Sequence, residues 1–438
     1  MRTQRRSAAR IGAVLVLACA LAAGSAGGAG AQGSTPPGTF VTMHGDQPGE
    51  GYAWGISELA DIDGDGAAEV ISGAPFHTDA GGTFAGHTDV RSARTGAIIY
   101  SFFGQPGERH GYAMADAGDV NGDGIHDIVI GAPGAALRCG SNPLPGRTYV
   151  YSGADGSTLL TLEGEAPGDQ YGGAVGAAGD VNRDGRADLL IGAPCFDGVG
   201  ADSGKAYVVS GRSGRVLRSY AGRAAGDHFG IGIAPAGQVD RDGRLDHIVG
   251  ASDGGPGDRG AAYVFSGLTG HQLLVLTGDA DTVDLGWFFV AGLGDVDDDK
   301  RGDLYVGDFN GGPNGDGRGL AFVFSGKTGE VLHRFAGDAP GDGAGPGRYA
   351  GDVDGDGRND VAVGFYLSSA GAPGAGLVKV YSGKTGDVLR TYISTVAQEN
   401  LGFDAVGLGD VNGDGIVDLG LSAASGDVLY VVSSAASS

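Results

Sequence analysis

The stretch that decides the fold is Asp119-Val120-Asn121-Gly122-Asp123-Gly124-Ile125-His126-Asp127, one of seven acidic nonapeptides of similar pattern in this 438-residue chain. The intervals between successive copies are 58, 61, 58, 57, 57 and 58 residues. A fixed period of this size predicts one supersecondary unit copied many times and either stacked as a solenoid or closed as a propeller. The copies begin at Asp61, Asp119, Asp180, Gln238, Asp295, Asp352 and Asp410.

Each nonapeptide is a cluster of oxygen donors. In the first copy, Asp61 is position 1, and Asp63, Asp65 and Glu69 are positions 3, 5 and 9. The glycines between them allow the tight turn because they tolerate positive φ. Carboxylates this close repel one another unless a hard cation lies among them, and Ca2+ accepts about six to eight oxygens in flexible geometry. Mg2+ is the weaker candidate because it prefers a small octahedron with its own waters. The ligand positions hold no Cys or His, which argues against zinc or copper there.

We therefore predict calcium loops, with about six occupied sites. Loop five replaces both glycines, and loop four has the neutral Gln238 at position 1, so we expect loop four to be weak or empty. Position 7 of six loops is counted with the candidate ligands. The candidates are Asp61, Asp63, Asp65, Ala67 and Glu69; Asp119, Asn121, Asp123, Ile125 and Asp127; Asp180, Asn182, Asp184, Arg186 and Asp188; Asp240, Asp242 and Asp246; Asp295, Asp297, Asp299, Arg301 and Asp303; Asp352, Asp354, Asp356, Arg358 and Asp360; Asp410, Asn412, Asp414, Ile416 and Asp418.

The loops differ from EF-hands, which need a bidentate Glu at position 12 and flanking helices. Position 12 here lies in a short apolar run such as Asp127–Ile130, and such runs bounded by glycine and proline predict strands. Each loop should therefore join two strands. Asp/Gly-rich segments can also be plain turns, but seven copies at a constant spacing favour the metal site.

The rest of the repeat adds two shared features. In the first three copies a Gly-Ala-Pro triplet begins twelve residues after position 1, as in Gly131–Pro133. An aromatic–glycine pair such as Tyr171-Gly172 begins nine residues before position 1. Together with the acidic loop, this pattern resembles the FG-GAP repeat of integrin α-subunits and many bacterial secreted proteins. The resemblance covers essentially the whole chain after the leader, although repeats four to seven depart from the triplet. It implies an all-β fold: a seven-bladed β-propeller with one four-stranded blade per repeat.

The strand pattern supports this fold independently. Residues 147–153 and 159–162 read as a hairpin around Asp155-Gly156, and a turn that ends in glycine between alternating strands is a strong hairpin signal. The seventh repeat lacks its last strand, whereas residues 39–46 precede repeat one and match residues 158–165. An N-terminal strand that completes the C-terminal blade would close the ring and leave no open edge.

The N-terminus predicts export. Residues 1–31 have the basic start, short apolar run and small-residue end of a signal peptide, residues 32–38 form a short flexible leader, and residues 39–438 form the propeller. The apolar run is too short to span a bilayer. The predicted location is therefore extracellular or at the cell surface. The Val16–Cys19 segment faintly resembles a lipobox, so a form lipid-anchored at Cys19 is the alternative.

The net charge excludes some classes of binding partner, and the two cysteines after the leader suggest a crosslink. Removal of the signal's four arginines leaves 25 basic residues against 53 acidic ones, a net charge of −28, which disfavours nucleic acid and anionic lipid. Cys139 and Cys195 occupy similar loops of neighbouring repeats, and a disulfide between them is our hypothesis, with two free thiols as the alternative.

No catalytic constellation stands out in the sequence. The leading hypothesis is a secreted, calcium-stabilised propeller that acts as a binding or adhesion module for a protein or glycan ligand. The protein is expected to be a monomer. The alternatives are an extracellular polysaccharide lyase or hydrolase on a propeller scaffold and a structural cell-surface component.

Trp54, Trp287, Phe288 and Tyr349 could line a central channel or pack between blades, and packing is the favoured interpretation. Arg301-Gly302-Asp303 spells an adhesion tripeptide, but Asp303 is position 9 of loop five and is expected to face the metal.

Overall fold

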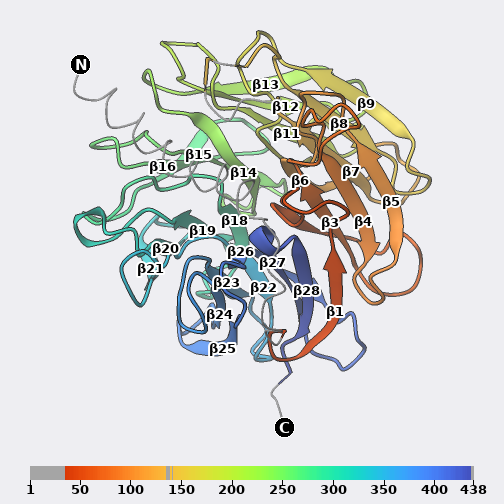
Figure 1. Cartoon of the computed structure of the whole chain (residues 1–438). Coiled ribbons are helices and arrows are strands. Elements are labelled where there is room, and N and C mark those ends of the chain that lie inside the picture. Colours follow the sequence, from red (N-terminus) through yellow and green to blue (C-terminus); the bar gives the residue numbers. More distant parts are fainter. Residues whose placement is uncertain (1–34, 135–138, 141, 436–438) are drawn as a thin grey trace.

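Each sequence repeat folds into one four-stranded antiparallel sheet, and seven such blades form a ring (Figure 1). The computed structural model describes residues 35–134, 139–140 and 142–435. The first strand of each blade lies at the axis and the fourth lies at the rim, because the first strands line the central cavity. The predicted seven-bladed β-propeller is confirmed.

The first three blades follow the chain from the axis outward. Blade one consists of β2 (Ile56–Leu59), β3 (Glu69–Ala74), β4 (His87–Ser92) and β5 (Ile98–Phe103). Blade two consists of β6 (Ala113–Gly118), β7 (Asp127–Ala132), β8 (Arg147–Tyr151) and β9 (Thr158–Glu163). Blade three consists of β10 (Ala174–Gly179), β11 (Asp188–Ala193), β12 (Lys205–Val209) and β13 (Val216–Ala221).

The remaining blades repeat this order, and two short 3-10 helices accompany them, η1 (Pro313–Gly315) and η2 (Ala424–Gly426). Blade four consists of β14 (Phe229–Gly237), β15 (Asp246–Ala251), β16 (Ala261–Phe265) and β17 (Gln272–Leu276). Blade five consists of β18 (Val290–Gly294), β19 (Asp303–Asp308), β20 (Leu320–Phe324) and β21 (Val331–Ala336). Blade six consists of β22 (Tyr349–Gly351), β23 (Asp360–Phe365), β24 (Leu377–Tyr381) and β25 (Val388–Ile393). Blade seven consists of β26 (Leu401–Gly409), β27 (Asp418–Ala423), β28 (Val428–Ser433) and β1 (Thr39–His44).

Burial explains the two kinds of strand pattern. The second strand of every blade is buried at each position, since neighbouring blades cover both of its faces, and its sequence is accordingly a continuous apolar run. The outermost strands keep exposed residues along one side, as β1 does in strict alternation and β9 does with one irregularity, because only one face meets the core.

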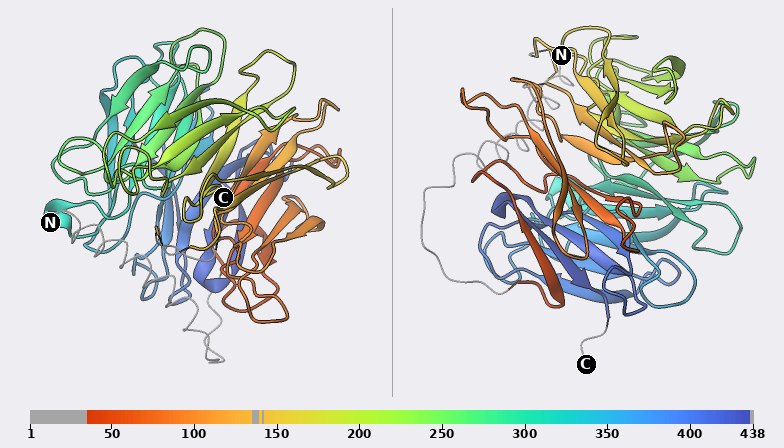
Figure 2. Two further views of the ribbon diagram at one scale, coloured as in Figure 1. Left: turned by 90° about the horizontal axis from the view of Figure 1, so that it is seen from above. Right: turned by 90° about the vertical axis from the view of Figure 1, so that its right-hand side faces the viewer.

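The N-terminal strand closes the ring, as predicted. β1 pairs antiparallel with β28, with Thr42 opposite Tyr430, and Met43 is buried in the joint. Figures 1 and 2 show this strand beside the C-terminal strands although it comes from the other end of the chain. The carboxylate of Asp427, just before β28, accepts hydrogen bonds from the N–H groups of Gly49 and Gly51. These bonds fix the connection between blade seven and blade one.

The ring has two different faces. In every blade the acidic loop joins the first strand to the second, so all seven loops lie on one face. The segments that lead into the first strands, such as Tyr52–Gly55, lie on the opposite face. A metal loop and the residues before the inner strand of the same blade are therefore separated by the length of that strand.

The predicted signal segment, including Cys19, lies outside the described residues, and the structure describes residues 35–38 of the leader. Within the described part of the chain, no helix has the length and apolar character needed to cross a membrane.

Candidate metal centres and axial cavity

Each acidic loop is held by hydrogen bonds from its own backbone to its carboxylates. In loop one, Asp61 accepts the N–H groups of Gly64 and Gly66, at 2.7 and 2.9 Å. Asp63 accepts the N–H of Asp65, and Asp65 accepts the N–H of Ala67. The bonds turn the chain so that side chains two residues apart point toward one centre. Position 7 can then offer only its main-chain carbonyl to a metal, since its side chain is Ala, Ile or Arg and has no oxygen.

The position 9 carboxylate is the buried end of each loop. Asp127 begins β7, is fully buried, and accepts the N–H groups of Val120 and Asn121 within the loop. It also accepts the N–H of Gly153 from the hairpin, at 3.0 Å. One carboxylate thus links the loop, the second strand and the hairpin of a blade. The equivalent residues, all fully buried, are Glu69, Asp188, Asp246, Asp303, Asp360 and Asp418.

Burial raises the pKa of these position 9 groups, because the charged form loses solvation. The pKa of Glu69 rises to about 8, and neighbouring Asp63 and Asp61 contribute to the rise. The pKa values of Asp188, Asp303, Asp360 and Asp418 rise to about 6, and those of Asp127 and Asp246 also rise. The anionic form is disfavoured at each site, which is the electrostatic setting that a bound cation would reverse.

Several loops bring their oxygens together. In loops one, four and five, three carboxylates each place a ligand atom within 4.8 Å of the other two. The members are Asp61, Asp63 and Glu69; Asp240, Asp242 and Asp246; and Asp295, Asp297 and Asp299. An all-oxygen set on a flexible loop fits Ca2+ better than a transition metal. The donors present therefore fit the predicted ion.

Loop five keeps this shape without glycine at positions 4 and 6. Asp298 and Lys300 have φ values of 71° and 69°, close to the 80° and 85° of Gly64 and Gly66. Such a left-handed backbone costs a non-glycine residue about 1–3 kcal/mol. The loop geometry is thus imposed by its carboxylate hydrogen bonds even where the residue opposes it.

The position 7 side chains have a second role that the sequence did not reveal. Arg358 extends from loop six to loop five, where it donates to the main-chain oxygen of Asp295 at 3.3 Å and pairs with Asp298. Arg301 reaches Val239 in loop four in the same way. These arginines connect successive loops around the ring. The recurrence of arginine at position 7 was the feature of the sequence from which these contacts could have been predicted.

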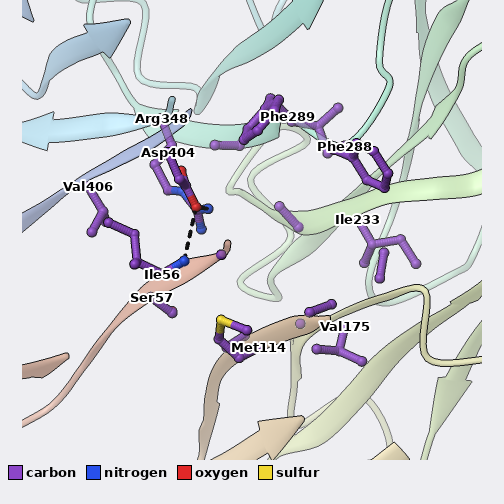
Figure 3. A pocket seen from close by; sticks show the side chains of 18 of the residues that line it. Ile56, Ser57, Met114, Val175, Ile233, Phe288, Phe289, Arg348, Asp404 and Val406 are labelled. Carbon is purple, nitrogen blue, oxygen red and sulfur yellow. Dashed lines mark hydrogen bonds and ion pairs between the residues drawn. The ribbon is translucent and has the colours of Figure 1, made fainter. Parts of the chain in front are cut away.

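A cavity of about 450 Å³ lies on the ring axis, lined by the first strands (Figure 3). Seven aromatic side chains form a closed circuit of ring contacts with centroids 4.8–6.3 Å apart. The circuit runs through Trp54, Tyr112, Phe288, Trp287, Phe309, Tyr366 and Phe403. Four of them come from loops that precede inner strands, on the face opposite the metal loops.

The favoured interpretation of these aromatics, packing, is confirmed, since each of the four lies in or packs against a buried hydrophobic cluster. Trp54, Phe288 and Tyr349 line the axial cavity as well, and Trp287 stands behind Phe288 in the aromatic circuit. Phe288 also has a φ of 65°, which is uncommon for a bulky residue and places its ring at the cavity. Inter-blade packing could not be distinguished from axial placement because both need an aromatic residue just before the inner strand.

The lining of the cavity also contains polar groups. Arg348 forms a 2.6 Å ion pair with Asp404, whose carboxylate also accepts the N–H of Ile56 at 3.2 Å (Figure 3). Tyr349 donates a hydrogen bond to Glu58, and burial raises the pKa of the Glu58 carboxyl. Asp116 also lines the cavity. The cavity thus joins aromatic faces to predominantly acidic polar groups.

Comparison with known proteins agrees with this architecture. Residues 115–151 and 171–209 match the sequence profile described as the FG-GAP repeat. The chain carries FG-GAP repeats. It is 35% identical over 214 residues to integrin alpha-V of Gallus gallus and 34% identical over 212 residues to integrin alpha-IIb of Homo sapiens, with 45% of this chain and 20% of each relative covered. The chain therefore spans about a fifth of the length of these relatives. The predicted resemblance to an integrin α propeller is confirmed.

The FG-GAP propeller also contains a repeated buried acid that our reading of the sequence missed. It lies ten or eleven residues before position 1, and in blade two it is Glu108, which accepts bonds from Arg147 at 2.6 Å and Tyr149 at 2.8 Å. The seven equivalents, all buried, are Glu50, Glu108, Asp169, Asp227, Asp284, Asp342 and Glu399. Their constant spacing from the metal loop was the signal. They lie on the aromatic face and fix the connection between blades.

Two further predictions concern single sites of the FG-GAP propeller. Cys139 and Cys195 are disulfide-bonded, with Cα atoms 5.2 Å apart, so the hypothesis of a bridge between blades two and three is confirmed. Asp303 of the adhesion-like tripeptide is fully buried and accepts the N–H of Gly326, which places its carboxylate inside loop five.

Proposed function

We propose that this FG-GAP propeller is a secreted, calcium-stabilised binding module that takes a protein or glycan ligand at its axial cavity. The supporting observation is the axial cavity, whose lining includes Trp54, Tyr112, Phe288 and Phe403 of the aromatic circuit. Aromatic faces stack on sugar rings and on planar side chains, and they attract cations. A largely preformed concave site with a few polar groups is the usual form of a ligand pocket.

The charges of the cavity favour a ligand with a cationic or neutral group. Glu58, Asp116 and Asp404 line the cavity, and Arg348 is committed to Asp404. A cation over an aromatic face gains about 0.5–2 kcal/mol, more when it is desolvated. An anionic ligand would meet these carboxylates and would lose solvation without compensation.

Calcium has a structural role in this proposal. The metal loops lie on the face opposite the aromatic circuit, and their position 9 carboxylates join three parts of one blade. An ion bound there would cross-link the inner strands without touching the ligand. Removal of calcium should therefore weaken ligand binding only to the extent that the blades loosen.

The enzyme hypothesis is less well supported than the binding module. The relatives reported above are named as integrin α-subunits, and those names describe no catalytic activity. A structural surface component would show calcium-dependent self-association, which the experiment below also measures.

The test combines a glycan array and capture of exported proteins with the mature chain in calcium buffer. Every ligand found is then measured against Phe288→Ala, which opens the aromatic circuit, and against Val216→Ala, a change on the outer strand β13 where Val216 is 56% exposed. We expect Phe288→Ala to weaken binding by at least about tenfold, as for a central anchor residue, and Val216→Ala to leave it unchanged. Equal affinity of all three proteins, or self-association as the only interaction, would overturn the proposal.

A further inference from the structure

Blade one contains a second kind of donor cluster, unrelated to the acidic loops. Glu50, His77 and His87 are buried, and each places one ligand atom within 4.8 Å of the other two. Glu50 belongs to the connection between β1 and β2, His77 follows β3, and His87 begins β4. Two imidazoles and a carboxylate form a donor set that suits zinc and similar transition metals, whereas calcium prefers oxygen alone.

His87 lacks one of the partners that a buried histidine normally has. Its side chain is about 1% exposed, and its Nδ1 has no hydrogen-bond partner. Its Nε2 lies 2.9 Å from the carboxylate oxygen Oδ1 of Asp89. A buried polar group left unbonded costs about 1–3 kcal/mol. An imidazole in this state, beside a carboxylate that can orient it, has the arrangement of a metal-ligating histidine.

The other two donors are already close together. His77 Nδ1 and Glu50 Oε2 are 2.6 Å apart, so one proton lies between two groups that could both bind a metal. Ligand atoms around a tetrahedral zinc ion are about 3.3 Å apart, given metal–ligand bonds of about 2.0–2.1 Å. The three donors thus need only small side-chain shifts to surround an ion, which would displace that proton.

Blade two shows what the same position looks like without a metal. There the buried acid is Glu108, and it is satisfied by Arg147 and Tyr149. These residues align with His87 and Asp89, since the two strands read His-Thr-Asp-Val-Arg-Ser and Arg-Thr-Tyr-Val-Tyr-Ser. Blade one has replaced the cation and the phenol with an imidazole and a carboxylate. The scaffold does not require that change, because blade two folds in the same way without it.

We propose that Glu50, His77 and His87 bind one Zn2+-class ion where the connection from β1 enters blade one. The ion would tie the β1–β2 connection to the hairpin of β3 and β4. It lies at the end of β3 opposite loop one, about 17 Å away at about 3.3 Å per residue. The site is therefore separate from the calcium loops, and its metal can be tested while they are saturated.

The experiment is zinc content and Co2+ absorption of the mature chain in excess calcium. We expect about one tightly held Zn2+ per chain and a four-coordinate Co2+ spectrum. The His87→Arg, Asp89→Tyr double variant gives blade one the two groups that satisfy Glu108 in blade two, so it should keep its calcium and lose the zinc. His271→Gln, in an exposed turn, should keep both metals. Zinc should also raise the melting temperature by about 3 °C at roughly a hundredfold excess over its dissociation constant.

Two results would overturn the proposal: an unaltered chain that retains almost no zinc, or a double variant that retains as much as the unaltered chain. If the double variant does not fold, the single change His77→Gln and the cobalt spectrum decide in its place. A spectrum typical of six-coordinate cobalt, unchanged by His77→Gln, would then count against the site. Loss of zinc with calcium content unchanged would support it.

Discussion

The side-chain amide of Gln238 donates a hydrogen bond of 2.7 Å to the main-chain oxygen of Arg244, which is position 7 of loop four. Its amide oxygen accepts the N–H of Gly243 at 3.0 Å, as the Asp at position 1 does in other loops. The amide oxygen of Gln238 thus takes the place of the position 1 carboxylate. Its amide N–H group binds the position 7 carbonyl, which in an occupied loop would bind the cation. This explains in structural terms why loop four was expected to be weak or empty.

The first prediction follows from that bond. Gln238→Asp removes the amide donor and restores the fourth acidic oxygen, so the number of bound calcium ions should rise by one. Metal analysis after gel filtration in calcium buffer measures this number. Gln238→Asn is the matched control, since it has the size of Asp without the charge and should add no ion. An unchanged count in the Asp variant would show that loop four is closed to calcium for another reason.

Removal of calcium should destabilise the whole ring. Each ion bound only to the folded state contributes about 2.7 kcal/mol at a hundredfold excess over its dissociation constant. Several such sites together contribute about as much as the whole free energy of unfolding of a typical folded domain, which is about 5–15 kcal/mol. EDTA should therefore lower the melting temperature sharply and expose the chain to protease, and Mg2+ should restore less stability than Ca2+. A melting curve that is the same with and without EDTA would contradict the loop assignment.

The disulfide should stabilise the contact between blades two and three. Cys139 and Cys195 enclose a sequence separation of 56 residues, for which the chain-entropy account gives about 4 kcal/mol. The Cys139→Ala, Cys195→Ala double variant should lose stability of this order in chemical denaturation. Reductant is the internal control, because it should lower the stability of the unaltered chain and leave the variant unchanged. Equal stability of the two proteins without reductant would show that the bridge adds nothing to the closed ring.

Loss of the N-terminal strand should open the ring. Deletion through His44 removes β1 and leaves the backbone of β28 unpaired, and an unpaired edge invites pairing with another chain. We expect self-association, measured by light scattering after gel filtration. A chain that starts at Thr39 keeps β1 and is the control, and it should behave like the longer protein. A monomeric, fully folded deletion variant would mean that blade seven is stable with three strands.

A buried carboxyl in blade five should give a pH dependence. Asp308 ends β19, accepts the N–H groups of Val283 and Asp284, and its pKa is raised to about 7, first by burial and then by the charge of Asp284. A pKa raised on folding stabilises the protein below the unfolded value, and this contribution is lost as pH rises. Between about pH 4 and 7, the free energy of unfolding should fall through this group. Asp308→Asn should remove this pH dependence of the free energy of unfolding. The variant should therefore be less stable than the unaltered chain at low pH, and the difference in unfolding free energy should shrink as pH increases in calcium buffer. A constant difference would contradict the assignment.

The sequence by itself determined the features that repeat. The spacing of the acidic loops, the Gly-ended hairpin turns and the match of residues 39–46 to residues 158–165 predicted seven blades and the way they close, because each is a local signal copied many times. The candidate loop ligands followed from spacing as well, since alternate residues of a tight turn converge without help from the rest of the chain.

Only the tertiary structure decided what neighbouring blades bring together. The aromatic circuit joins residues from Trp54 to Phe403, and the histidine cluster joins Glu50 to His87 across three separate segments. An aromatic residue before an inner strand has the same local sequence whether it packs between blades or faces the axis. The curvature of the closed ring sets which of these occurs, and that curvature is a property of seven packed blades rather than of any one repeat.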